Sequence, residues 1–145
     1  MVYCTTEEIE TQLSSATLVQ LTNDSGLQDG IDYAVCEEAL IYSSTLIDGY
    51  LRGKYNLPLN THFPLLRVIA IDLSIYRLFS RRIHTEIPDV IIENYKNALK
   101  TLEQIKKGVI TLETEDNTQL TSGGEYRTNK TNADRLFNKR KMNEY

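Results

Sequence analysis

Apolar side chains recur every three or four residues through much of the chain, which is the spacing of helices with one buried face. The clearest case is the segment 33–54, which Asp32 is placed to cap. One face of this predicted helix carries Cys36, Leu40, Ser43, Ile47, Tyr50 and Leu51, and the other carries Glu37, Thr45, Asp48 and Arg52. Asp48 and Arg52 are four residues apart, so we predict a structural ion pair between them on the outer face.

A second helix is predicted over 64–82, with Pro64 at its first position and apolar residues on nearly all of its faces. Such a helix has to be covered from several sides, by its neighbours or by another subunit. Asp72 is the polar exception, and a lone carboxylate there would be costly without a cation. We predict a structural ion pair, with Arg52 or Arg67 as the partner, because a catalytic acid would need a second convergent carboxylate or histidine.

The remaining helices are shorter or end in clear signals. A third long helix is predicted over 88–107, starting at a proline and ending in Lys-Lys-Gly. Thr5 and Glu8 form a capping box for a short helix from Thr6 to about Ser14, and a second short helix is predicted over 15–21. The expected fold is therefore all-α: a small bundle of three main helices plus short N-terminal helices, with an extended C-terminal arm.

The last part of the chain has a different composition. Residues 109–113 alternate weakly and predict a short strand, and residues from 114 onward are polar and rich in Gly, Ser, Thr and Asn. The closing ADRLFNKRKMNEY is again apolar and basic. We therefore divide the chain into a helical body, 1–108, and a region of strand, flexible linker and docking arm, 109–145.

Charge and cysteine content narrow the class of protein. The formal charge is -4, with 10 Lys/Arg against 15 Asp/Glu in residues 1–113 and 6 against 5 in residues 114–145, so nothing indicates a general nucleic-acid binder. Cys4 and Cys36 would allow one disulfide, but their apolar helical contexts favour buried, reduced thiols in a cytosolic protein. No signal peptide is expected, and charged residues interrupt the apolar stretch 63–79 too often for a membrane span.

No motif in the sequence predicts catalysis or a cofactor. His62 and His84 lack metal-ligand spacing, and the serines of segment 33–54 lie in mid-helix rather than on a strained turn. The acidic loop 22–32 fails as a calcium loop because Cys36 stands where the bidentate glutamate belongs. We therefore predict a protein that is not an enzyme and has no cofactor and no bound metal.

Several stretches together resemble the small connector family of Mu-like phages and prophages. The most specific is Ile47 to Tyr55 followed by Leu57-Pro58-Leu59, reading IDGYLRGKY-x-LPL. The others are Tyr3-Cys4-Thr5, Leu21-Thr22-Asn23-Asp24, Ala70-Ile71-Asp72-Leu73 with Tyr76-Arg77-Leu78, and Arg135 to Lys139 near the end. The resemblance covers most of residues 1–108 and touches the C-terminus.

The resemblance implies a structural virion protein, a head-tail connector or adaptor that forms a ring under the portal and completes the neck. Its partners would be the portal protein, other neck or tail-completion proteins and further copies of itself in a ring expected to be twelve-fold. DNA would pass through the lumen without sequence-specific binding, and the protein would be located in the host cytoplasm before assembly and in the virion neck afterwards. The alternative is a small non-enzymatic regulatory domain of a prophage that binds another protein.

Two segments are the expected contacts with partners. The corner around 54–59 would lie near a subunit contact, through Tyr55, Leu57 and Leu59. The arm would order on a partner, anchored by Leu136 and Phe137, with Arg135, Lys139 and Arg140 on acidic or polar sites.

Overall fold

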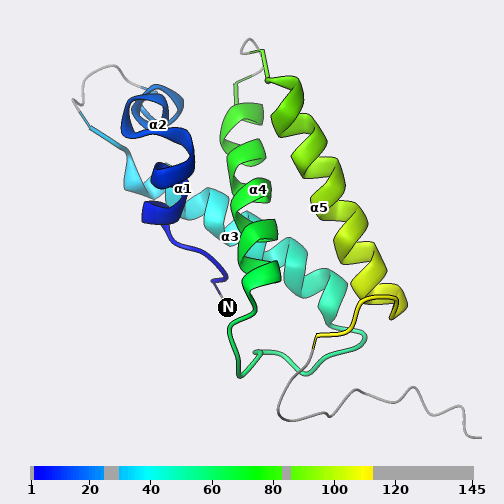
Figure 1. Ribbon diagram of the computed structural model, residues 1–145. Coiled ribbons are helices and arrows are strands. Elements are labelled where there is room, and N and C mark those ends of the chain that lie inside the picture. The colour runs from blue at the N-terminus through cyan, green and yellow to red at the C-terminus, as the bar shows by residue number, and fades with distance from the viewer. Residues whose placement is uncertain (1, 25–29, 83–85, 113–145) are drawn as a thin grey trace, which may run out of the picture.

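A computed structural model describes residues 2–24, 30–82 and 86–112, and over these ranges the chain is all-helical, with five helices and no strand (Figure 1). The helices are α1 (Thr6–Leu13), α2 (Ser15–Thr22), α3 (Tyr33–Leu51), α4 (Pro64–Ser80) and α5 (Asp89–Lys107). The predicted all-α bundle of three long and two short helices is thus confirmed.

Local sequence signals set most of the helix ends. The Thr5–Glu8 capping box begins α1, and the Asp32 side chain accepts a hydrogen bond from the Ala34 N–H to begin α3. Gly108 ends α5 in the left-handed conformation, with φ of 83°. The Lys54 ammonium donates to the Ile105 carbonyl at this end, 3.2 Å away, so the corner after α3 caps α5.

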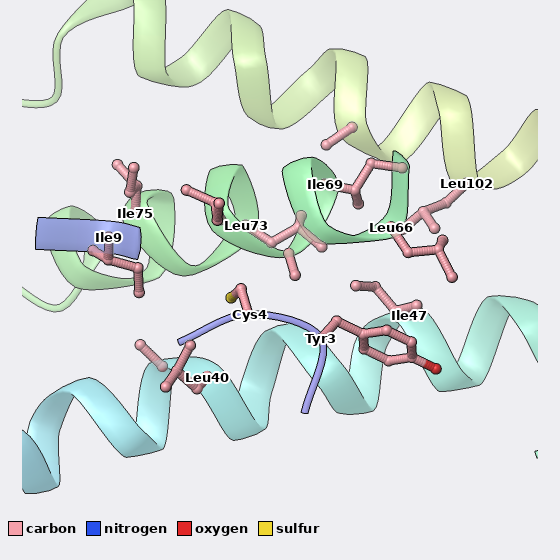
Figure 2. Packing of buried hydrophobic residues seen from close by; sticks show 14 of the residues in the cluster. Tyr3, Cys4, Ile9, Leu40, Ile47, Leu66, Ile69, Leu73, Ile75 and Leu102 are labelled. Atoms are coloured by element: carbon pink, nitrogen blue, oxygen red, sulfur yellow. The ribbon is translucent and has the colours of Figure 1, made fainter. Parts of the chain in front are cut away.

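The core lies where α3, α4 and α5 meet. In Figure 1, α4 and α5 run side by side while α3 crosses behind them, and α1 and α2 lie on the other side of α4. Figure 2 shows Ile47 and Leu40 of α3 facing Leu66 and Leu73 of α4, with the N-terminal segment passing between the two helices. Burying this apolar surface is the main source of stability.

The core contains a pair of hydrogen-bonded serine hydroxyls and two free thiols. Ser74 of α4 hydrogen-bonds to Ser43 of α3 at 2.9 Å, and Ser43 donates to the Leu40 carbonyl, so these hydroxyls are paired across the main helix contact. Cys4 and Cys36 are free and buried, as predicted, and burial raises the pKa of the Cys4 thiol to about 11.

The structure corrects the ends of two helices and the predicted strand. α3 ends at Leu51 rather than at Lys54, because residues 52–54 form a turn, and α4 ends at Ser80. Residues 109–112 form no strand, since no second strand is present in the described ranges to bond with them. Ile110 and Leu112 instead pack against the core, and the division of the chain at residue 108 stays a prediction.

The apolar helix α4 is covered mainly from within the chain. α3, α5, α1 and α2 all contact it, and nine of its residues are buried. A strip containing Leu65 and Val68 stays exposed, at 40% and 55%. None of the helices in the described ranges has the length and hydropathy to cross a membrane.

Candidate functional site

Two open sites lie on opposite flanks of α5. Ala98, Leu102 and Ile105 form the buried centre of its apolar stripe. At about 100° per residue, Val90 and Asn94 fall on one side of that stripe, whereas Lys106 falls on the other. One site therefore lies between α5, α4 and α1, and the other between α5 and α3.

The first site is a groove of about 380 Å³ between α3 and the C-terminal half of α5, which we call the tyrosine groove. It is lined by Tyr42, Thr45, Leu46, Gly49 and Tyr50 of α3 and by Lys106 of α5. Among the described residues of this lining Lys106 alone is charged, and its ammonium lies 5.9 Å from the centre of the Tyr50 ring. A cation held beside an aromatic face remains able to meet an anion from outside.

Stacked aromatic rings support one end of the tyrosine groove. Tyr76 of α4 and Tyr95 of α5 stack with ring centres 3.9 Å apart, and the Arg77 guanidinium lies 4.9 Å from the centre of the Tyr42 ring. Burial raises the pKa of Tyr95, and the nearby Tyr42 adds to the shift, so the phenol stays neutral. Tyrosine and arginine are enriched at protein interfaces, which makes this surface suited to binding a protein.

The second site is a pocket of about 150 Å³, which we call the Asp72 pocket. It is lined by Gln12 and Leu13 of α1, Asp72 and Ile75 of α4, and Val90, Ile91 and Asn94 of α5. Asp72 is the one charged residue that the structure describes in the lining, and burial raises the pKa of its half-buried carboxyl group. The walls are mainly apolar, with the two amides of Gln12 and Asn94 as the other polar groups.

Asp72 has no hydrogen bond or ion pair to another residue of the described ranges. Arg67, one of the two cations predicted to pair with Asp72, instead forms an ion pair of 3.2 Å with Glu8 near the start of α1. The predicted structural ion pair of Asp72 therefore stays a prediction, and its cation would have to come from outside the described part of this chain. Desolvation raises the free energy of a carboxylate in this setting, and no attractive partner in the described residues offsets that cost.

Asp48 has a role that the sequence did not predict. Its carboxylate accepts a hydrogen bond of 2.5 Å from the hydroxyl of Tyr3, which is itself buried between α3 and α4. Burial raises the pKa of Tyr3, and the Asp48 carboxylate adds to the shift. This bond ties the N-terminal segment to α3, and the predicted pairing of Asp48 with Arg52 stays a prediction.

The predicted contact corner is largely built into the body. Tyr55 and Leu59 are buried, at 4% and 5% exposed, and Leu57 is partly buried against the core. The Tyr55 hydroxyl accepts a hydrogen bond of 3.0 Å from the Leu112 N–H. These contacts give the three side chains an intramolecular role, and their binding to a partner stays a prediction. The predicted arm residues Arg135, Leu136, Phe137, Lys139 and Arg140 lie outside the described residues.

The two arginines after α4 hold the end of α2. Arg81 donates to the Leu21 carbonyl at 3.2 Å, and Arg82 donates to the Asn23 carbonyl at 2.9 Å. Both also pair with the Asp24 carboxylate. These contacts satisfy carbonyls that a helix end leaves unpaired, in addition to the favourable dipole position expected for cations after α4.

The Asp24 contacts predict a pH effect on stability. Hydrogen bonds from Arg82 and Arg81 lower the pKa of Asp24. The stabilisation is therefore present above the unfolded pKa of about 3.9 and is lost as pH falls through the lower folded value. In thermal melts, we expect Asp24→Asn to lower the Tm at pH 6, and the two melting curves to converge under strong acid.

The matched control is Glu93→Gln, which neutralises an exposed acid of α5 that makes no ion pair within the described ranges. This variant should follow the wild-type protein over the acid range. High salt should narrow the Asp24 difference because the contact is exposed. A constant gap between wild type and Asp24→Asn down to pH 2 would contradict the assignment.

Both sites combine mainly apolar walls with one described charged residue, Lys106 or Asp72. No group of three or more His, Cys, Asp or Glu able to hold a metal occurs among the residues that the structure describes. Asp72, the sequence's best candidate acid, has hydrocarbon and amides around it rather than a second titratable group.

Sequence reasoning missed the tyrosine groove. Tyr42 was given no role, and Tyr50 was assigned to the buried face, although it is only partly buried. The signal that could have found it is the concentration of tyrosines, nine in a chain without tryptophan. Tyr42 and Tyr50 are two turns apart on α3, so they share one face.

The chain was compared with known protein families and with curated proteins. A family model described as "Bacteriophage Mu, Gp36" matches residues 3–130. This match includes all five helices and both open sites, and it ends before Arg135. No curated protein matches the chain.

Proposed function

This chain belongs to the bacteriophage Mu Gp36 family, and from that premise we propose that it is a non-enzymatic structural protein, a head-tail connector that forms a ring under the portal and completes the neck of the particle. Family membership supports a phage protein. The connector role within the phage is our proposal.

One observation carries this proposal: the helical body has two concave sites of different character, the tyrosine groove and the Asp72 pocket, on opposite flanks of α5. A subunit with unlike surfaces on two sides suits heterologous contacts, and heterologous contacts close into rings when the rotation between subunits permits. Ring formation would bury both sites and the exposed strip of α4.

Further partners are proposed from the rest of the chain. The arm ending in Arg135 to Arg140 would bind the portal, with Leu136 and Phe137 as apolar anchors and the basic residues on acidic or polar sites. Other neck or tail-completion proteins would bind the ring on its far side. The excess of acidic residues in the body would let DNA pass through the lumen, because phosphates are held by cationic surfaces. The protein would lie in the host cytoplasm before assembly and in the virion neck afterwards.

Removal of residues 120–145 tests the portal contact. We expect the truncated chain to keep its helical circular dichroism and its Tm, since every helix in the described part of the chain ends by Lys107. Binding to purified portal, measured by co-sedimentation and electron microscopy, should be lost.

The matched point variant replaces both Leu136 and Phe137 by Ser, and its control replaces Leu120 by Ser in the polar linker. Only the first should weaken binding, by about a hundredfold or more if two anchor residues are lost. Portal binding by the truncated chain at wild-type affinity would show that the arm is not the contact.

A further inference from the structure

The Asp72 pocket has the shape and chemistry of a socket for one basic side chain. Its volume of about 150 Å³ resembles that of a cavity that admits a benzene ring. Leu13, Ile75 and Ile91 offer apolar surface for an aliphatic stem, and the Asp72 carboxylate offers an anion for its charged end. The described part of the chain places no cation there.

The tyrosine groove has the complementary chemistry. Lys106 is exposed and is the one charged side chain among the groove residues described above, with aromatic and aliphatic neighbours in Tyr50 and Leu46. Exposed apolar residues also lie beside each of the two sites, so each site has an apolar surface that the other could cover. Val90 is 67% exposed at the pocket, while Ile41 and Tyr42 are 53% and 36% exposed on the face of α3 that leads into the groove.

The positions of the two sites exclude an internal contact. Val90 at the pocket and Lys106 at the groove are sixteen residues apart on one rigid helix, about 24 Å at 1.5 Å per residue. Lys106 of a given copy therefore cannot reach Asp72 of the same copy. It can reach the Asp72 of a neighbour.

We propose that the Asp72 pocket binds a second copy of this chain, whose tyrosine groove packs over it and places Lys106 against the Asp72 carboxylate. The contact is heterologous, so each copy offers its pocket to one neighbour and its groove to the other. This inference deepens the proposed function by naming the surfaces that join adjacent subunits, and it rests on that function only for the ring as the final state. An ion pair formed in this way is shielded from water by the apolar rims and recovers the cost of holding Asp72 half-buried.

A charge-reversal cycle on the full chain tests the contact. Self-association of the wild type is measured by sedimentation velocity and native mass spectrometry at rising protein concentration. Asp72→Lys and Lys106→Asp should each weaken association at least about tenfold. Mixing the two variants should restore it, because each remaining contact then joins opposite charges, and the product should contain the two variants in alternation.

Controls separate this contact from a folding defect. Glu93→Lys and Lys100→Asp reverse exposed charges of α5 that line neither site, and they should associate like the wild type. Asp72→Asn should weaken association while leaving the Tm of the isolated subunit unchanged or higher, since the carboxylate has no cation in the described part of the subunit. A merely structural Asp72 would instead lower the Tm.

Three results would overturn the proposal. The first is a wild type that stays monomeric at the highest soluble concentration, and the second is association unaffected by either reversal or not restored by mixing. The third is loss of association in the chain lacking residues 120–145, which would make the C-terminal segment the occupant of the pocket. Portal binding is measured separately. If the charge reversals do not change self-association but the portal is still bound, the subunit contact alone is rejected. If the charge reversals act as expected but the portal is not bound, the connector role alone is rejected.

Discussion

Leu73→Ala should lower the Tm of the isolated protein by roughly 10–20 °C. Leu73 is fully buried in the middle of α4, where that helix crosses α3 (Figure 2). Removing the side chain forfeits its transfer free energy and leaves a cavity among side chains that relax only in part. Such substitutions cost about 2–5 kcal/mol, a large share of the roughly 5–15 kcal/mol that stabilises a typical domain. Thermal melts followed by circular dichroism at 222 nm measure the change.

Val68→Ala is the matched control. Val68 lies on the same helix but is 55% exposed, so its truncation should change the free energy of unfolding by less than about 0.5 kcal/mol. A large loss of stability at Leu73 and a small one at Val68 would show that contacts within one chain stabilise α4 in the dilute subunit. Equal and small effects at both positions would mean that the described packing of α4 does not carry the stability of the monomer.

The fold followed from the sequence because its signals are local. The Thr5–Glu8 capping box, the Asp32 cap, Pro64 and Gly108 each act within one turn of a helix, so each end could be predicted from the neighbouring residues. The exceptions are the ends of α3 and α4, which lie at Leu51 and Ser80 and so before the predicted ends. Whether 109–113 formed a strand also depended on a distant partner, which local sequence does not reveal.

The candidate sites depended on tertiary placement and were predicted less well. Asp72 stood out in the sequence because a charge on an apolar helix is rare, but its pocket is completed by α1 and α5. Tyr55 and Leu59 were chosen because they lie at an abrupt corner, where an exposed contact was expected. In the structure the corner packs against the end of α5, where the Lys54 ammonium donates a hydrogen bond to the Ile105 carbonyl. Both side chains, Tyr55 and Leu59, are buried there.

Tyr55→Ala should destabilise the protein by about 3–5 kcal/mol, as expected for removal of a buried aromatic side chain. The residue is 4% exposed and packs in the core, while its hydroxyl accepts a hydrogen bond from the Leu112 N–H. The substitution therefore removes both the packing of the corner after α3 and the anchor of the segment after α5. Equilibrium unfolding in urea gives the free energy, and a partner-binding role alone would leave it unchanged.

Tyr55→Phe separates the two effects. It keeps the ring but leaves the buried Leu112 N–H without its acceptor, at a cost of about 1–3 kcal/mol. Hydrogen exchange should then accelerate at the Leu112 amide while the amides of α4 keep their protection relative to global unfolding. This hydrogen bond ties the segment after α5 to the corner after α3. If Tyr55→Phe leaves exchange at the Leu112 amide unchanged, this hydrogen bond does not hold the segment after α5 to the body in solution.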